Sequence, residues 1–175
     1  MAGKNETSET PQIKPHGTIA KILHWGFAVI FAYAIFKQVD NVGQLEDGAL
    51  LRFEMVFAAA FLALLVVRYV FMQKTRPSAL PEETAKWKKQ AARLGHLAMY
   101  LSLSMIALSG LLIGTLFGIG LSNGLMMDAA IGLHEVSVLA SYITIGVHVL
   151  AAIYHRILGD GIWTTMVPLL TEKQR

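Results

Sequence analysis

The chain has 175 residues, of which 54% are hydrophobic and 15% are charged. Soluble domains usually carry nearer a quarter of charged residues, so this composition excludes an ordinary soluble protein and indicates a membrane protein. The absence of cysteine excludes disulfides, iron–sulfur clusters and thioether-linked haem, and the net charge of +3 comes with no nucleic-acid-binding motif.

Four apolar runs, each long enough to cross the hydrocarbon core of a bilayer, organise the chain. They cover Ile19–Val39, Ala49–Met72, Leu94–Leu121 and Ile131–Leu158. We therefore expect an all-α fold, a four-helix transmembrane bundle embedded in a lipid bilayer. Its parts are a polar N-terminal tail (residues 1–18), a four-span membrane domain (19–158) and an interfacial tail (159–175).

The positive charges are distributed unevenly between the two sides of this bundle. All Lys and Arg residues except Lys37 and Arg52 fall on the side that carries both termini and the loop between the second and third spans. Cytoplasmic loops of membrane proteins are enriched in Lys and Arg. The sequence therefore predicts a multi-pass membrane protein with both termini in the cytoplasm.

Histidines are concentrated in the apolar runs. The first run contains His24, and the fourth contains His134, His148 and His155. Imidazoles are costly in hydrocarbon unless they face the bundle interior and bind something. The spacing of His134 and His148 is about four helical turns, so they point the same way roughly 21 Å apart. That separation suits two stacked cofactors, or a cofactor and a relay site, better than one metal ion.

The first and fourth runs offer a pair of histidines at matching depth. Counted from the outer ends of their runs, His24 and His148 differ in depth by roughly 3 Å. Two neutral imidazoles on facing helices would hold a low-spin haem suited to electron transfer. The alternative is that each histidine is a hydrogen-bonded core residue.

The outer level lacks such a pair. His134 lies about one turn inside the fourth run, and a partner at its depth would come from residues 52–56, which include Glu54 and Met55 but no histidine. Methionine ligates haem in some cytochromes, whereas a carboxylate is a poor ligand. Glu54 has an alternative role with equal weight, as the acceptor of a hydrogen bond from His134 Nδ1 or as the salt-bridge partner of Arg52.

Three polar residues lie near the inner ends of the spans. Arg68 is placed to bind a haem propionate bidentately or to extend toward lipid phosphate. His96 and His155 fit a quinone site, because quinone reduction needs proton donors and imidazole titrates near neutral pH. A simple interfacial role fits these two histidines equally well.

The third run carries Gly110, Gly114 and Gly118 at intervals of four residues. Small residues at this spacing let helices approach closely in lipid. We therefore expect a packing role for these glycines rather than a cofactor-binding role.

Several segments together resemble the prokaryotic cytochrome b561 family. They are Leu23-His24-Trp25, Val66-Val67-Arg68, Gly95–Tyr100, Leu133-His134-Glu135 and Gly146-Val147-His148. The resemblance spans roughly Ile19 to Pro168, and it implies a four-helix inner-membrane protein with two b haems that exchanges electrons with quinones. It also implies that His24 and His148 ligate the inner haem and that His134 ligates the outer one.

The chain departs from the family pattern at the outer site. The family's second outer ligand is a second-span histidine followed four residues later by glycine, and those positions are Glu54 and Ala58 here. The number of non-covalent b haems, one or two per chain, is therefore open. The outer site is lost, or altered in its ligation, or completed by a partner subunit.

Three functions remain open on the sequence. The first is a quinone-linked haem protein that carries electrons between ubiquinone and a periplasmic or membrane redox partner. A superoxide:quinone oxidoreductase is one version of it, which the scarcity of outer positive charge disfavours. The second is a haem subunit that anchors a periplasmic dehydrogenase or hydrogenase. The third is a haem-free membrane protein for assembly or proton relay.

Overall fold

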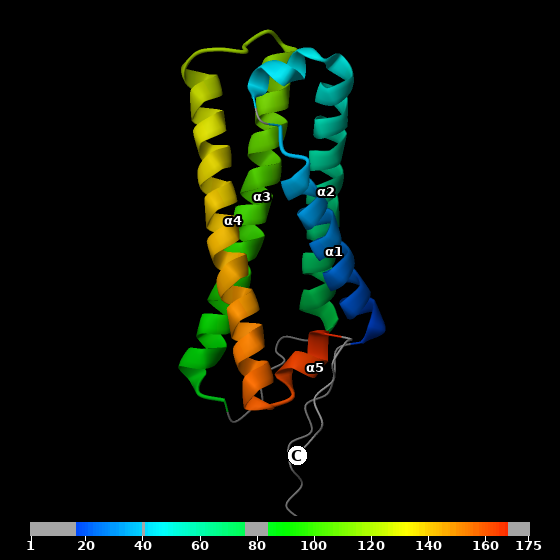
Figure 1. The fold of residues 1–175 in the computed structure, drawn as a ribbon, viewed down its shortest axis with the longest axis vertical. Coiled ribbons are helices and arrows are strands. Elements are labelled where there is room, and N and C mark those ends of the chain that lie inside the picture. Colours follow the sequence, from blue (N-terminus) through cyan, green and yellow to red (C-terminus); the bar gives the residue numbers. More distant parts are fainter. Residues whose placement is uncertain (1–16, 40, 76–83, 168–175) are drawn as a thin grey trace, which may run out of the picture.

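The computed structural model describes residues 17–39, 41–75 and 84–167. Its elements are α1 (Thr18–Phe36), η1 (Val42–Glu46), α2 (Gly48–Thr75), α3 (Lys86–Gly118), α4 (Leu125–Leu158) and α5 (Ile162–Met166), arranged as in Figure 1. The described residues contain no strand, and the four long helices are long and apolar enough to cross a membrane. The expected all-α, four-helix transmembrane bundle is confirmed. Most of the predicted polar N-terminal tail and the end of the interfacial tail lie outside the described residues.

The helices do not begin and end where the apolar runs do. α3 begins at Lys86 rather than Leu94, and α4 begins at Leu125 rather than Ile131. Hydropathy marks the part of a helix that lies in hydrocarbon, whereas the backbone hydrogen bonds continue into the interfacial region. The 34 residues of α4 therefore extend about 51 Å, well beyond a hydrocarbon core.

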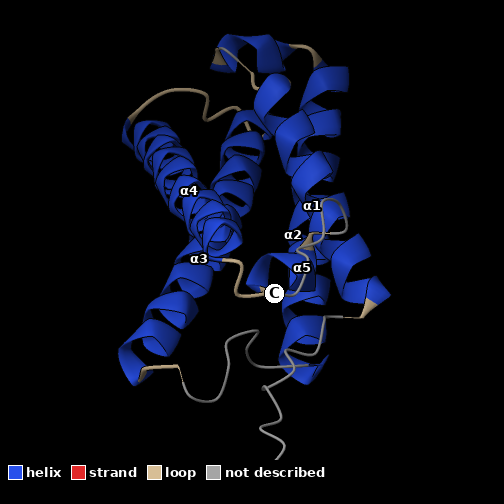
Figure 2. Cartoon of the chain, turned by 60° about the horizontal axis from the view of Figure 1, so that its bottom comes forward, coloured by secondary structure: helices blue, strands red, loops and turns tan. Residues whose placement is uncertain are grey.

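α3 is the central helix of the bundle. It packs along both α2 and α4, and α1 packs on α2 (Figures 1 and 2). A buried cluster joins the first three helices; its members are Phe27, Phe61, Leu65, Leu103 and Ala107. Large apolar side chains on the outside of all four long helices stay exposed, as expected of a surface that faces lipid.

The glycines of α3 differ in what they contact. A Cβ added at Gly114 would lie 2.8 Å from Met55 Cγ, so the absence of a side chain lets α2 and α3 approach closely. A Cβ at Gly110 would contact His134 Cε1 at 3.6 Å. Gly118 has nothing within 4 Å of that position. The structure supports the packing role at Gly114, finds room for an ordinary van der Waals contact at Gly110, and does not support the role at Gly118.

The short helix α5 closes one end of the bundle against α1 (Figure 2). Gly159, at φ +64°, ends α4 in the left-handed conformation and lets the chain turn back. Lys21 Nζ then donates to the carbonyl of Thr164, and Trp25 Nε1 donates to the carbonyl of Met166, both at 3.1 Å. We call this end, which carries α5, the inner end.

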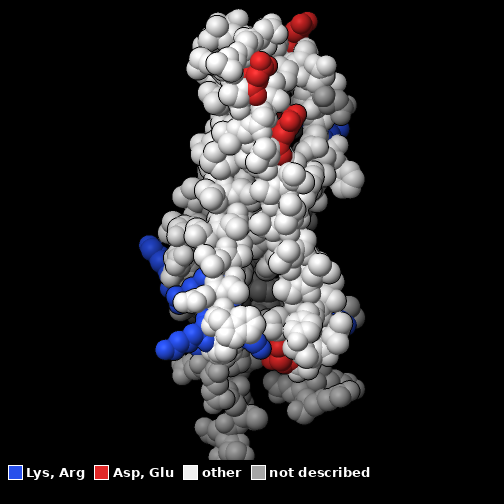
Figure 3. Space-filling model, turned by 90° about the vertical axis from the view of Figure 1, so that its left-hand side faces the viewer, with Lys and Arg blue, Asp and Glu red and all other residues white. Residues whose placement is uncertain are grey.

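Charge is segregated along the long axis of the molecule. On the face shown in Figure 3, Lys and Arg gather toward the inner end, while acidic side chains predominate toward the opposite, outer end. The exposed acidic residues of the outer end include Glu46, Asp47 and Asp128. The orientation of the chain across a membrane stays a prediction that rests on this asymmetry.

Candidate functional site

Three imidazoles from three helices lie close together toward the inner end. The ring centroids of His24 (α1) and His148 (α4) are 6.3 Å apart, with the ring planes at 59°. His96 (α3) approaches His148 edge to face at 5.3 Å between centroids. No group of three or more His, Cys, Asp or Glu among the described residues is arranged to hold a bare metal ion. The structure thus brings together the two predicted inner ligands and one predicted quinone residue.

Arg68 adjoins this cluster from α2. Its Nη2 lies 2.7 Å from Nδ1 of His24, its Nη1 donates weakly to the His24 carbonyl at 3.5 Å, and its guanidinium lies 5.5 Å from the centre of the Phe27 ring. Its Nε is buried and has no hydrogen-bond partner in the described part of the chain. Arginine can only donate, and a buried donor without an acceptor is costly. The local chemistry therefore favours an additional acceptor, such as a carboxylate, beside Arg68.

The two predicted quinone residues have different partners. Nδ1 of His96 lies 2.7 Å from the Ala92 carbonyl, which can only accept, so Nδ1 carries a proton and Nε2 is left to accept. Nδ1 of His155 lies 2.6 Å from Asp160 Oδ2. The other carboxylate oxygen of Asp160 accepts the N–H of Ile162 at the start of α5, at 3.2 Å. The structure therefore orients His155 through Asp160 but does not join it to His96.

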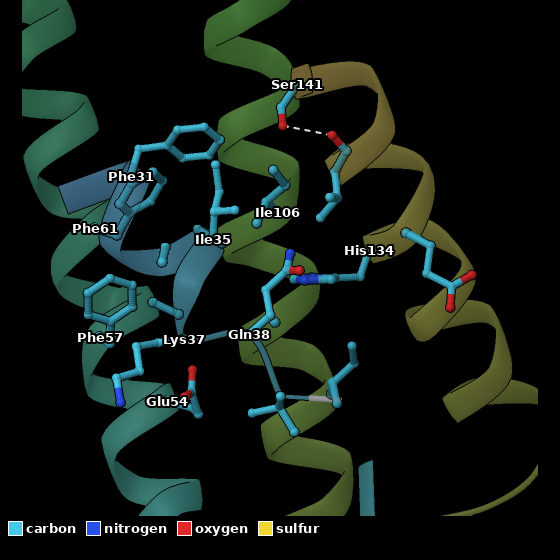
Figure 4. Close-up of a pocket in the computed structure, with 18 of the residues that line it drawn as sticks. Phe31, Ile35, Lys37, Gln38, Glu54, Phe57, Phe61, Ile106, His134 and Ser141 are labelled. Atoms are coloured by element: carbon cyan, nitrogen blue, oxygen red, sulfur yellow. Dashed lines mark hydrogen bonds between the residues drawn. The ribbon is translucent and has the colours of Figure 1, made fainter. Parts of the chain in front are cut away.

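Toward the outer end the helices line a partly open cavity of about 520 Å³ (Figure 4). Its described lining residues come from all four long helices and from the segment between α1 and α2, and many are aromatic or aliphatic. His134 enters it from α4, and Glu54 enters it from α2 on the other side. Ala58 also lines it. The predicted outer pair therefore faces one common space.

The Nδ1 atom of His134 is hydrogen-bonded to a serine. Nδ1 lies 3.0 Å from Ser109 Oγ, and that hydroxyl already donates to the Met105 carbonyl at 2.5 Å. Ser109 must then accept, so His134 carries its proton on Nδ1 and leaves the lone pair of Nε2 available. This is the tautomer that metal-ligating histidines adopt. The alternative partner for Nδ1, Glu54, is not the one that the structure shows.

Two further expectations about residues 52–56 concern their contacts. Arg52 donates from Nε to the carbonyl of Gly48 at 3.0 Å, rather than to Glu54. Met55 packs against α3, where its sulfur would lie 3.3 Å from a Cβ at Gly114, and it does not line the cavity among the described residues. Of Glu54 and Met55, the two candidate outer ligands on α2, the structure turns Glu54 toward the cavity.

Sequence reasoning missed Ser109, Lys37 and Gln38. Ser109 is 1% exposed in an apolar span, and a buried hydroxyl needs a partner, which was the available signal. Lys37 and Gln38 line the cavity from the non-helical segment after α1, and Figure 4 shows Gln38 turned toward His134. Their position depends on how η1 folds back, which no pattern in the sequence reports.

Comparison with known proteins identifies the family. Residues 15–169 match the family model described as prokaryotic cytochrome b561. No curated protein and no solved structure matches the chain significantly. The matched region includes all four long helices, the histidines near the inner end and His134 at the outer cavity. This multi-pass membrane protein therefore belongs to the prokaryotic cytochrome b561 family, whose members are b-type cytochromes that transfer electrons.

Proposed function

We propose that the chain is a quinone-linked electron carrier in which His24 and His148 ligate an inner b haem. The observation that carries this proposal is the separation of their ring centroids, 6.3 Å. A metal–imidazole bond of roughly 2 Å and about 1.2 Å from the nitrogen to the ring centre would separate two opposite ligands by roughly 6.4 Å. His96 and His148, at 5.3 Å, fit this arrangement less well.

Arg68 supports the same site through its unpaired Nε. A haem propionate would supply the acceptor that this buried nitrogen needs. Ligation through Nε2 of His24 requires Nδ1 to carry a proton, and an arginine cannot accept it. Arg68 must therefore release Nδ1 of His24 when haem binds, and a propionate gives the guanidinium a better partner.

When bound, haem supplies reversible one-electron chemistry, and two imidazole ligands keep its iron low-spin and closed to further ligands. The protein side chains position this group and exclude water from it. His24 and His148 come from the first and the last long helix, so they hold α1 and α4 across the site. Arg68 balances negative charge in an apolar environment.

We place quinone chemistry at the inner end, where His96 and His155 lie. Quinone reduction consumes protons as well as electrons, so a proton donor must lie at the site. Asp160 orients the His155 ring through its contact with Nδ1. His96 contacts His148 edge to face, which puts a second imidazole beside the proposed inner haem.

The same arguments extend to localisation. We propose the bacterial inner membrane, with both termini in the cytoplasm, because Lys and Arg gather at the inner end. A reporter that fluoresces only in the cytoplasm, fused after Arg175, is expected to be active. An inactive fusion, with an active periplasmic reporter at the same position, would reverse the orientation.

A second function has support from the outer surface. Glu46, Asp47 and Asp128 are exposed there, so the outer end suits a basic periplasmic redox protein, with this chain as its haem subunit. The same negative charge repels superoxide, which makes that anion an unfavourable donor. Salt-sensitive co-purification of a basic redox protein would support the second function over a stand-alone carrier.

Haem content tests the first function directly. The pyridine haemochrome assay on detergent-purified protein is combined with electron paramagnetic resonance to detect low-spin iron. We expect His24→Ala and His148→Ala to lose one low-spin haem, whereas the control His96→Ala keeps it. If His148→Ala kept the full low-spin signal, the proposed pairing would be wrong. Protein without haem, made in haem-replete cells, would favour the haem-free alternative.

A further inference from the structure

The outer cavity offers iron one strong protein ligand. Its volume of about 520 Å³ is within the range of cofactor sites, and the rings of Phe31, Phe57 and Phe61 help to line it (Figure 4). His134 projects into this space with its proton fixed on Nδ1 by Ser109. Its Nε2 is therefore prepared to bind a metal without any change of tautomer.

The opposite wall lacks a matching ligand. α2 presents Glu54 to the cavity, followed one turn later by the small side chain of Ala58. The Met55 sulfur packs against Gly114 instead. Haem irons in proteins are held by His, Cys, Met or Tyr, and carboxylates are poor substitutes. No side chain that α2 directs into this space is therefore a good second ligand.

Two tyrosines line the cavity, and their positions do not suit ligation opposite His134. Tyr142 lies on the same helix as His134, about 12 Å further along its axis. Tyr33 lies on α1 with its ring 5.9 Å from that of Phe57, and it is 43% exposed. Neither tyrosine belongs to α2, the helix that lies across the cavity from His134.

Lys37 and Gln38, which directly follow α1, line the cavity and can change their side-chain positions when haem binds. The Gln38 amide, which turns toward His134 (Figure 4), belongs to a non-helical segment, so it can move aside without breaking a helix. Lys37 lines the same cavity and brings a positive charge to balance a propionate. Gly110 keeps the His134 ring clear of any α3 side chain at that position.

We propose that this cavity holds a haem bound through His134 alone, with the opposite iron position open on the Glu54 side for a small diatomic ligand. The inference rests on the haem-binding function proposed above, but it concerns a different site from His24 and His148. Iron with one imidazole and one open position binds diatomic gases, whereas iron with two imidazoles does not. CO is the probe that separates the two haems.

The test uses full-length protein purified in detergent without imidazole in any buffer. Haem content, ferric electron paramagnetic resonance and the CO difference spectrum after dithionite reduction are measured together. We expect two haems per chain, of which half bind CO, and one high-spin signal beside one low-spin signal. His134→Ala is expected to lose the CO-binding haem and the high-spin signal while one low-spin haem remains.

Glu54→His supplies the second imidazole, so it is expected to abolish CO binding and convert the high-spin signal to low-spin with haem content unchanged. The control is Asp128→His, also an acidic-to-histidine change, at an exposed α4 residue that does not line the cavity, and it is expected to leave CO binding intact. Glu54→Gln, a small change that preserves folding, is also expected to keep CO binding.

The outcomes separate this inference from the proposed function. Two haems without CO binding would overturn it, because another side chain then closes the outer iron. One haem without CO binding would overturn it as well, because the cavity then takes no haem, while the inner pair stands. One haem that binds CO and is lost in His134→Ala would support the open outer site and refute the His24–His148 pairing.

Discussion

The hydrogen bond between Ser109 and His134 gives the sharpest prediction about the outer site. Ser109 is 1% exposed, and its oxygen lies 3.0 Å from His134 Nδ1. Ser109→Ala removes this acceptor and leaves the buried His134 ring with the Ile106 carbonyl as its remaining hydrogen-bond partner among the described residues. Losing one hydrogen bond costs about 0.5–1.5 kcal/mol, and removing a hydrogen-bond partner of a metal-ligating histidine typically weakens metal binding about 10–100-fold. Since a tenfold change is about 1.4 kcal/mol, the two ranges meet at about tenfold.

The assay measures how fast each variant loses haem to an excess of an apo-haem protein that binds haem tightly. We expect Ser109→Ala to lose the CO-binding haem about tenfold faster than the wild type, with the low-spin haem unaffected. Ser109→Thr, which keeps the hydroxyl, is expected to restore most of the retention.

Ser102→Ala is the matched control for this comparison. Ser102 is on the same helix, is 6% exposed, and donates to the carbonyl of Met99, so the substitution removes the same atoms from a similar environment. Equal rates of haem loss in Ser109→Ala and Ser102→Ala would refute the reasoning. The hydrogen bond to His134 would then contribute nothing to holding the haem.

Three other outcomes follow from the structure. Arg68→Leu is expected to lower the low-spin haem content several-fold and Arg68→Lys less, by pyridine haemochrome assay; unchanged content would contradict a propionate partner. Gly114→Ala is expected to cost about 1–3 kcal/mol in thermal unfolding in detergent, because the new Cβ would overlap Met55; an unchanged melting temperature would mean that α2 yields freely. Asp160→Asn is expected to slow reduction of a soluble quinone analogue several-fold with unchanged haem spectra, since His155 loses its carboxylate; a wild-type rate would exclude His155 as the oriented donor.

The four spans and the approach of His24 to His148 were predictable because apolar length and histidine depth are local properties of the sequence. Counting the depth of each histidine from the outer end of its helix would have failed, however. α1 has 19 residues and α4 has 34, and α4 extends much further beyond its histidine toward the outer end than α1 does. Counting from the hydropathy boundaries succeeded because those boundaries follow the membrane. The proximity of the two rings is thus observed, whereas their ligand role stays a prediction.

The surroundings of His134 were less predictable, because they depend on which residues of other elements face the same space. Its depth relative to Glu54 could be counted, and both residues do line one cavity. The choice of Ser109 as partner of Nδ1 depends on the rotation of α3 about its own axis. The approach of Gln38 depends on the path between α1 and η1. Neither quantity has a signature in composition or periodicity.

The contacts between α1 and α5 have a consequence for the order in which the protein matures. The first helix is secured by backbone carbonyls of Thr164 and Met166, more than a hundred residues later in the chain. During synthesis α1 is made long before α5, so it gains these contacts only after α2, α3 and α4 have been made. The inner histidines His24 and His148 likewise meet only after α4 has been made, so a cofactor that needs both of them cannot bind earlier.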